Sequence, residues 1–106
     1  MVKRFEIYLL NLDAGASGEA KNTRPCVVIS PDEMNRSIAN VIVAPISSSS
    51  AGYPTRIEID MLNSKRAIIL DQLQTVDSRR LVKKIAELDQ QKQKQVTDIL
   101  LEMFAQ

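Results

Sequence analysis

Apolar residues occur along this chain in short runs, separated by polar segments that contain glycine or proline. This pattern is typical of short β-strands joined by loops. Strict alternation in residues 55–60 predicts a strand with one exposed face, and alternation in residues 5–12 places Phe5, Ile7 and Leu9 on one face. Pro45, near the end of another apolar run, indicates a bulge or a sheet edge. The expected strands are residues 5–12, 24–30, 41–46, 55–60 and 67–76.

Two segments fit helices instead. Residues 31–36 suit one helical turn, with Ser30 as a possible N-cap and Pro31 at the first helical position. Asp89 can cap a longer C-terminal helix, in which apolar residues recur every three or four positions, as on the buried face of an amphipathic helix. These apolar residues are Val96, Ile99, Leu100, Met103 and Phe104.

The segments between these elements differ in character. Residues 13–23 are small and polar and include two glycines, which predicts a long loop; such a loop in a compact domain is more often functional than decorative. Asp77 or Ser78 is expected to cap a short turn. Residues 80–88 fit either a helix or a last strand, and both interpretations remain open.

Five or more short strands and one terminal helix predict a mainly β fold of the α+β class, a small antiparallel barrel covered on one side by the helix. At 106 residues and 11.9 kDa, we expect one domain that spans residues 1–106. The chain shows neither a signal-peptide pattern nor an apolar run of about 18 residues, so we expect a cytoplasmic protein.

Composition excludes several kinds of chemistry. The chain has no histidine and one cysteine, Cys26, which rules out a Ser-His-Asp triad, a histidine-ligated metal and a cysteine zinc cluster. It also lacks a glycine-rich phosphate loop and a dinucleotide fingerprint. The net charge of +1 neither requires nor excludes a nucleic-acid partner. An enzyme with this sequence must use arginine, lysine, carboxylates, hydroxyls and amides.

Arg24 is the strongest candidate for a functional residue, because it begins an apolar strand that Pro31 ends. A guanidinium at the rim of a core can hold a phosphate or a carboxylate through two hydrogen bonds. The structural alternative is an ion pair with an acidic neighbour such as Glu19 or Asp71. The residues alone leave an anion site and a structural salt bridge both open.

Three other side chains have comparable alternatives. The hydroxyl of Ser47 ends a strand and can donate to a phosphate, or it can simply terminate the strand in a serine-rich turn. Asp71 is expected inside an apolar strand, where a carboxylate must be either paired or used. Glu19 is either a solvated loop charge or a carboxylate that closes over a substrate.

The order and spacing of these segments resemble the MazF/PemK family of bacterial toxins, small endoribonucleases of toxin–antitoxin pairs. The most specific match is Thr23-Arg24-Pro25 followed by Val-Val-Ile-Ser-Pro. Weaker matches extend over essentially the whole chain, at Glu6–Leu9, Leu12–Asp13, Glu19, Val41–Ser47, Gly52–Pro54 and Asp71–Asp77.

The resemblance implies an SH3-like barrel of the CcdB/PemK kind that forms a homodimer and cleaves single-stranded RNA without a metal or other cofactor. In this mechanism the ribose 2′-hydroxyl attacks the adjacent phosphate, leaving a 2′,3′-cyclic phosphate and a 5′-hydroxyl. A cognate antitoxin with an acidic, disordered tail would block the RNA groove. The implied catalytic residues are Arg24 at the charged phosphorane, Ser47 on the phosphate and Glu19 or Asp71 as base. The implied RNA-binding residues are Thr23, Ser48, Gln72 and Arg56.

The chain departs from the family pattern at four positions. Phe5 replaces a glycine, Ala14 a proline and Ser47 a threonine, and Ile69 replaces an arginine of one plasmid-borne branch, so that arginine cannot act as the acid here. Two alternatives therefore stand beside the ribonuclease. One is a binding toxin like the gyrase poison CcdB, which would depend on residues 102–106, and the other is a decayed toxin that folds without cutting RNA.

Overall fold

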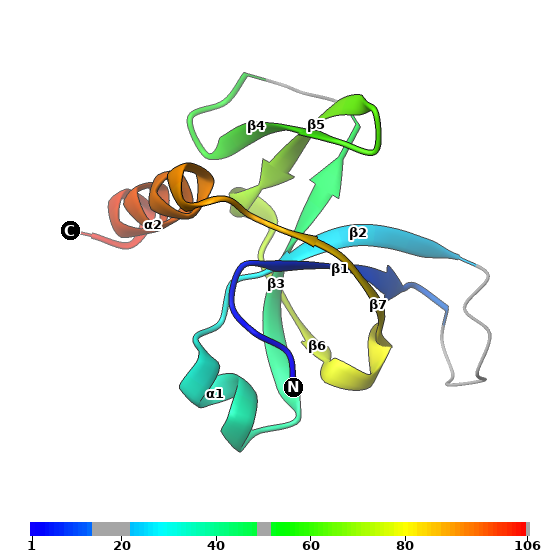
Figure 1. The fold of residues 1–106 in the computed structure, drawn as a ribbon. Coiled ribbons are helices and arrows are strands. Elements are labelled where there is room, and N and C mark those ends of the chain that lie inside the picture. Colours follow the sequence, from blue (N-terminus) through cyan, green and yellow to red (C-terminus); the bar gives the residue numbers. More distant parts are fainter. Residues whose placement is uncertain (14–21, 49–51, 106) are drawn as a thin grey trace.

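The computed structural model describes residues 1–13, 22–48 and 52–105, and an antiparallel β-sheet dominates it (Figure 1). Its strands are β1 (Glu6–Asn11), β2 (Thr23–Val28), β3 (Asn40–Ser47), β4 (Arg56–Met61), β5 (Ser64–Ile69), β6 (Gln74–Asp77) and β7 (Leu81–Glu87). The helices are α1 (Asp32–Ser37) and α2 (Gln90–Phe104), and two short 3₁₀ turns, Leu70–Gln72 and Ser78–Arg80, flank β6. This arrangement confirms the expected mainly β fold with a C-terminal helix.

The long strand β3 connects the two parts of the sheet. Its first half pairs with β6, and its middle pairs with β2 as far as Pro45, which lies opposite Cys26. Its last two residues, Ile46 and Ser47, pair instead with β5. The strand order is therefore β4-β5-β3-β2-β1-β7, with β6 beside β3. Pro45 has no N–H to donate, and it stands where β3 exchanges one partner for another.

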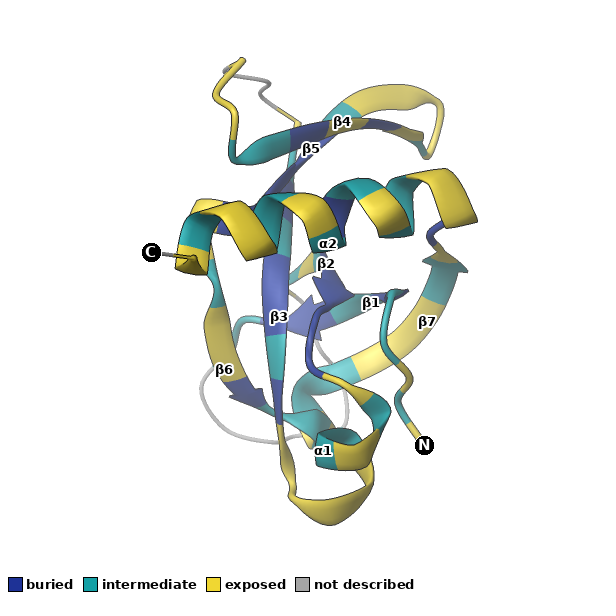
Figure 2. Ribbon diagram, turned by 90° about the vertical axis from the view of Figure 1, so that its left-hand side faces the viewer, coloured by how far each residue is buried: buried dark blue, intermediate teal, exposed yellow. Residues whose placement is uncertain are grey.

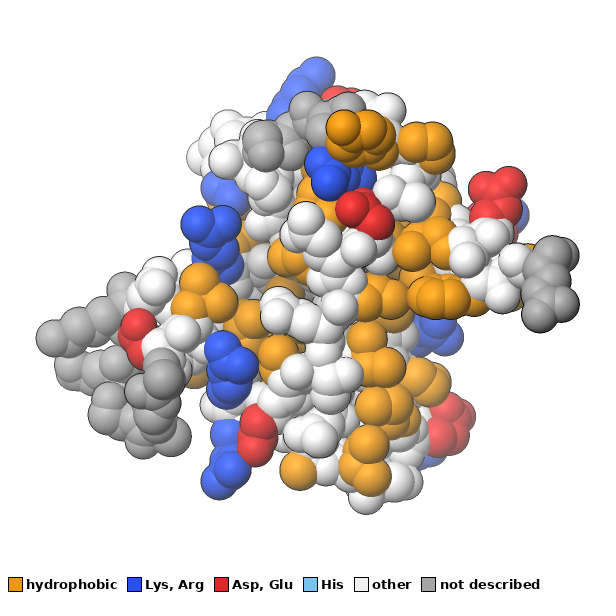
Figure 3. Space-filling model, turned by 180° about the vertical axis from the view of Figure 1, so that it is seen from behind, with side chains coloured by type: hydrophobic (Ala, Val, Ile, Leu, Met, Phe, Trp, Pro, Cys, Tyr) orange, Lys and Arg blue, Asp and Glu red, His pale blue; other side chains and the backbone are white. Residues whose placement is uncertain are grey.

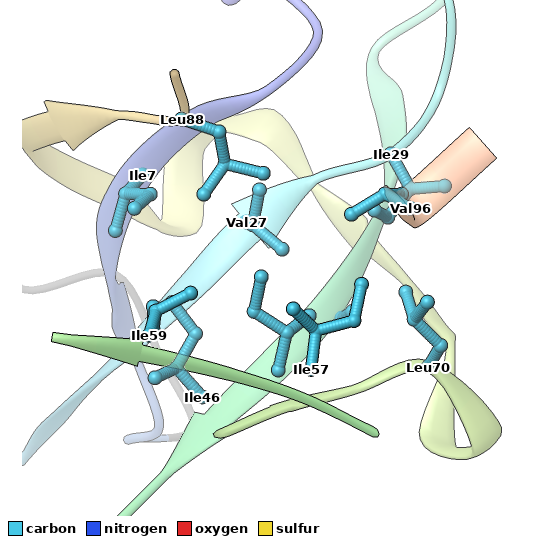
Figure 4. Close-up of a cluster of buried hydrophobic side chains, with 11 residues drawn as sticks. Ile7, Val27, Ile29, Ile46, Ile57, Ile59, Leu70, Leu88 and Val96 are labelled. Carbon is cyan, nitrogen blue, oxygen red and sulfur yellow. The ribbon is translucent and has the colours of Figure 1, made fainter. Parts of the chain in front are cut away.

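The main core lies between the sheet and α2, which crosses β3 between the β4–β5 hairpin and α1 (Figure 2). Aliphatic side chains from opposite ends of the chain meet there, with Val27 and Ile57 facing Leu88 and Val96 (Figure 4). A second cluster of buried side chains lies on the other face of β2 and β3. Its members are Leu10, Cys26, Val28, Val41, Val43 and Val76.

Helix α2 begins as predicted. The Asp89 carboxylate accepts a hydrogen bond from the Lys92 N–H at 2.8 Å, and Val96 is fully buried. The apolar stripe, however, ends earlier than expected, because Phe104 is 71% exposed. Neither of the two described helices is long and apolar enough to cross a membrane.

The expected strand 67–76 is wrong in its middle. A 3₁₀ turn interrupts it, with Leu70 fully buried and Asp71 exposed. From the pair of Ile46 with Ile68 to the pair of Val43 with Gln74 the chain advances three residues along β3 but six from β5 to β6. The extra residues cannot pair in register, and the turn accommodates them. Asp71 lies on this turn and not inside an apolar strand.

The predicted face of the first strand is confirmed for Phe5 and Ile7, which both contribute to the main core, whereas Leu9 is half-buried and belongs to neither cluster. Phe5 lies before β1 with a φ of 71°, in the left-handed region, and register shifts against β7 follow Ile7 and Leu9. The alternation nevertheless persists along β1: Phe5 and Ile7 contribute to the main core, and Tyr8 and Leu10 to the second cluster. Phe5 has this left-handed φ at the position where the MazF/PemK pattern has a glycine, the residue that adopts it without strain.

The structure corrects the predicted cap of α1 and decides between the two alternatives for residues 80–88. Pro31, not Ser30, is the N-cap residue of α1, and it makes no side-chain capping bond. The Ser30 hydroxyl instead donates to Asn35 Oδ1 at 2.6 Å and accepts from the Ile42 N–H at 3.0 Å, which fastens α1 to β3. Of the alternatives for residues 80–88, the strand is correct. Asp77 caps the turn before it by accepting from the Arg79 N–H.

Candidate active site

Arg24 and Ser47 lie at a fork in the sheet. On β2, Arg24 pairs with Leu10 of β1, but pairing between β2 and β3 begins only at Cys26 and Pro45. This register, continued by two residues, would place Arg24 opposite Ser47, but the pairing of β2 with β3 ends before them. Ser47 pairs with Ala67 of β5 on the other edge of β3, so Arg24 and Ser47 lie where β2 and β3 separate (Figure 1).

The same register places both side chains on one face. Cys26 and Pro45 lie opposite each other, and each is two residues from one of the candidates, so Arg24 and Ser47 share their face of the sheet. The burial of Cys26 raises the pKa of its thiol to about 12, which makes it an inert core residue. Cys26 is thus buried on this face, whereas Arg24, two residues earlier on the same strand, is exposed.

The guanidinium of Arg24 does not pair with Asp71. Within residues 1–13, 22–48 and 52–105, no carboxylate lies in ion-pair distance of Arg24. Glu19, the other acid considered for this pair and for the base, lies outside the described residues. The arginine is thus exposed at the fork and able to receive an anion.

Asp71 is instead joined to the start of β4. It accepts hydrogen bonds from Arg56 Nε at 3.2 Å and Nη2 at 3.3 Å, and from Thr55 Oγ1 at 2.8 Å. The hydrogen bonds from Arg56 and then from Thr55 hold the pKa of the Asp71 carboxyl below its usual value. A carboxylate engaged in this way is a weaker proton acceptor than a free one.

Arg56 is held on a second side by an aromatic ring. Its guanidinium carbon lies 4.7 Å from the centre of the Tyr53 ring, so the side chain is fixed between Tyr53 and Asp71. Arg56 pairs with Ile69 of β5, and Ser47 pairs with Ala67 on the opposite side of the same strand. Because Ala67 and Ile69 are two residues apart, Arg56 and Ser47 share a face, with about 12 Å between their backbones across β5.

The other predicted RNA contacts surround this arrangement. Thr23 pairs with Asn11 at the start of β2, Ser48 follows β3 directly, and Gln72 ends the turn that carries Asp71. Ser48 and Gln72 are exposed and Thr23 is half-buried. The structure thus brings Arg24 and Ser47 to one fork. Asp71 and Gln72 lie on the turn after β5, and Arg56 lies on β4, the neighbour of β5 on the edge away from β3.

Sequence reasoning missed Arg80. Its Nε donates to the backbone oxygen of Asn11 at 2.9 Å, which brings it to the end of β1, beside the strand that carries Arg24. The segment that contains it fitted both helix and strand, so the position of its side chain was undetermined. Viewed from behind, Lys and Arg side chains line the side of the molecule where β2 and β7 begin (Figure 3).

The described residues offer few groups for metal binding. Among them, no three or more histidine, cysteine, aspartate or glutamate side chains lie close enough to hold a metal ion together. The functional side chains at the fork are therefore a guanidinium and a hydroxyl, which suit the binding of an anion.

Comparisons with known proteins agree with the fold. The model of the PemK-like, MazF-like toxins of type II toxin–antitoxin systems matches residues 3–104. Endoribonuclease MazF of Staphylococcus saprophyticus is 33% identical over an alignment that covers 94% of this chain and 88% of that protein.

Two solved structures show the same fold. Toxin MazF-mt6 of Mycobacterium tuberculosis superimposes with a TM-score of 0.78 and 22% identity, covering 93% of this chain and 95% of that one. A MazE–MazF structure from Deinococcus radiodurans gives a TM-score of 0.79 and 20% identity, covering 98% of this chain and 95% of that one. At these identities the likeness concerns the fold.

Proposed function

The chain belongs to the PemK-like, MazF-like toxin family of type II toxin–antitoxin systems, and we propose that it is a toxin that cleaves single-stranded RNA. One observation carries the proposal: Arg24 is exposed at the fork of the sheet, on the same face as Ser47, and pairs with no described carboxylate. An exposed guanidinium beside a hydroxyl is suited to hold a phosphodiester. The name of the staphylococcal relative, an endoribonuclease, supports the same activity.

The proposed reaction is a transesterification without a metal. The 2′-hydroxyl of one nucleotide attacks the adjacent phosphorus, and the bond from phosphorus to the 5′ oxygen breaks. The products are a 2′,3′-cyclic phosphate and a 5′-hydroxyl. One proton leaves the 2′-hydroxyl for a general base, and one reaches the departing 5′ oxygen from Arg24 or from solvent. The need for a 2′-hydroxyl makes the reaction specific for RNA.

Within this reaction we assign Arg24 to the charged phosphorane, because a guanidinium can bind two of its oxygens as negative charge develops. Ser47 donates a hydrogen bond to the phosphate. Glu19 is the proposed base, since the alternative, Asp71, already accepts three hydrogen bonds and its pKa is lowered. Asp71 then serves to position Arg56 for contact with the RNA.

The remaining contacts we propose are with the RNA strand itself. Arg56, fixed between Tyr53 and Asp71, is suited to a phosphate or a base face. Thr23, Ser48 and Gln72 offer two hydroxyls and an amide around the fork. Hydroxyl and amide groups can bind either phosphates or base edges.

We further propose a homodimer and a cognate antitoxin with an acidic tail as partners. Solved relatives of this fold include a MazE–MazF complex and a mycobacterial endoribonuclease with its cognate antitoxin. Apolar side chains gather on the side of the molecule where α1 and α2 lie (Figure 3), and there Leu101 is 65% and Phe104 71% exposed. Large exposed apolar side chains support burial against another chain. The whole chain, residues 1–106, would then be one toxin domain.

The direct test is incubation of the purified protein with a long, defined RNA in EDTA, followed by mapping of the ends. Cleavage at a recurring short motif with 5′-hydroxyl ends is the expected result, and a 2′-deoxyribose placed at one mapped site should protect that site alone. Intact RNA in the presence of folded, antitoxin-free protein would contradict the proposal. A binding toxin or a decayed toxin would then explain the sequence better.

A further inference from the structure

Two adjacent arginines before β7 have different surroundings. Arg79 is exposed and paired with Asp77, with Nη2 2.8 Å from Oδ2 and Nε 3.1 Å from Oδ1. Arg80 is half-buried, and its Nε donates to the backbone oxygen of Asn11, 69 residues earlier in the chain. One guanidinium is therefore neutralised in solvent, and the other is held against the sheet.

The anchoring of Arg80 leaves most of its hydrogen-bonding capacity unused. Only Nε takes part in a bond to Asn11, and no carboxylate of the described part of the chain lies within ion-pair distance of the guanidinium. The two terminal nitrogens carry four N–H donors between them. The charge of Asp77 acts on Arg80 as well as on Arg79, but Asp77 forms its ion pair with Arg79. A fixed guanidinium without an ion pair of its own is suited to an anion, because little side-chain entropy is lost when the anion binds.

Arg80 lies at the end of β1, the strand that separates it from the strand carrying Arg24. Leu10 of β1 pairs with Arg24 on one side and with Leu81, the residue after Arg80, on the other. Three neighbouring strands thus place Arg24 and the start of β7 in one row, with about 10 Å between the outer backbones. Both arginines lie at the end of the sheet where β1 ends and β2 begins.

We propose that Arg80 binds a backbone phosphate of the RNA next to the phosphate held by Arg24. This inference rests on the proposed ribonuclease function and extends it to the path of the substrate. Two guanidinia at the same end of neighbouring strands suit two phosphates of one RNA strand, and a phosphate contact fixes the strand's register without reading its sequence. Arg80 therefore determines how firmly the RNA is held, and Arg24 determines how fast it is cut.

The test compares Arg80→Gln with Arg79→Gln, two identical changes at adjacent positions. The probe is a single-stranded 2′-O-methyl RNA of the sequence that the wild-type protein cleaves, which binds but cannot react. We expect Arg80→Gln to weaken binding about tenfold at 0.1 M salt. The slope of log K against log salt should also become shallower by about 0.7, the value for one phosphate of a single strand. Arg79→Gln should change neither quantity appreciably.

Cleavage kinetics and a folding control separate the possible outcomes. Arg80→Gln should raise KM with little effect on kcat, and it keeps an amide that can still donate to Asn11, so its melting temperature should stay close to that of the wild type. Unchanged affinity and salt slope in a folded Arg80→Gln protein would overturn the inference, and weakened binding of an acidic antitoxin peptide alone would assign Arg80 to that partner instead. A wild-type protein that cleaves no RNA would contradict the proposed function itself, which is a different result from an unaffected Arg80 variant.

Discussion

Arg56 donates two hydrogen bonds to Asp71, from Nε to Oδ1 at 3.2 Å and from Nη2 to Oδ2 at 3.3 Å. The pair connects the start of β4 to the turn between β5 and β6. It also occupies one of the two carboxylates that sequence reasoning considered for the general base. The pair therefore bears on the mechanism as well as on the fold.

The first prediction concerns this carboxylate. Asp71→Asn should lower RNA cleavage by less than about tenfold, mainly through KM, because it loosens Arg56 but removes no proton acceptor. A general base must be deprotonated to act, so the rate falls at acidic pH as that base takes up its proton. The acidic limb of the pH–rate profile should persist in Asp71→Asn and disappear in Glu19→Gln. Loss of the limb in Asp71→Asn would make Asp71 the base.

The second prediction concerns stability at low pH. Glu6 is buried, and it accepts hydrogen bonds from the Lys3 N–H at 2.7 Å and the Tyr8 hydroxyl at 3.1 Å, with Lys84 Nζ at 2.8 Å. Burial alone raises the pKa of the Glu6 carboxyl, but the hydrogen bonds from Lys84, Lys3 and Tyr8 outweigh it and lower the pKa.

Because the folded pKa of Glu6 is the lower one, its stabilisation is present above about pH 4.5 and is lost as the pH falls through the folded value. Glu6→Gln should lower the free energy of unfolding by about 1–3 kcal/mol at pH 7. It should also make the free energy of unfolding depend less on pH below 4.5, as measured by urea unfolding. Glu87→Gln is the control, since Glu87 lies on the exposed side of Lys84 and should contribute less than about 1 kcal/mol. Equal losses in the two variants would show that the buried network is not the cause.

The third prediction concerns the tip of the β4–β5 hairpin. Leu62 and Asn63 form its two-residue loop with φ values of 54° and 60°, and Leu62 is 59% exposed. Leucine is strained in this region and gains little packing in return. Leu62→Asn should raise the free energy of unfolding by roughly 0.5–1 kcal/mol.

A useful contrast is Phe5→Gly, also at a left-handed position. The Phe5 side chain packs against the main core and lies 5.0 Å below the Arg4 guanidinium. This change should therefore destabilise the protein in spite of the relieved backbone, because the lost burial exceeds the strain. Thermal unfolding should give a higher melting temperature for Leu62→Asn and a lower one for Phe5→Gly than for the wild type. A less stable Leu62→Asn protein would contradict the account of the turn.

Several features could be predicted from the sequence because they depend on local patterns. The alternation around Ile57 and Ile59 gave the β4 strand, and Asp89 gave the start of α2, since strand periodicity and capping are properties of a few neighbouring residues. The buried state of Cys26 followed from its apolar neighbours in the same way. The position of Arg24 in a strand also followed from its segment.

Other features depend on pairing between distant segments, which a local pattern does not contain. The turn at Leu70–Gln72 accommodates a register shift between the pairing of β5 and that of β6 with β3, and the ion pair of Asp71 follows from that turn. Arg80 became visible as a candidate only when its hydrogen bond to Asn11 placed it beside β1. The fork between Arg24 and Ser47 likewise depends on where the pairing of β2 with β3 ends, at Cys26 and Pro45.

The account rests most directly on Arg24. The decisive measurement is the single-turnover rate of RNA cleavage in EDTA by the wild type, Arg24→Ala and Arg24→Lys, together with the affinity of each for the uncleavable 2′-O-methyl RNA. We predict that Arg24→Ala lowers the rate by about 10²–10³-fold or more, with a much smaller loss of affinity and an unchanged melting temperature. Arg24→Lys should recover only part of the rate, because lysine cannot bind two phosphoryl oxygens in one plane. An Arg24→Ala protein that cleaves the same motif at nearly the wild-type rate would contradict the central claim.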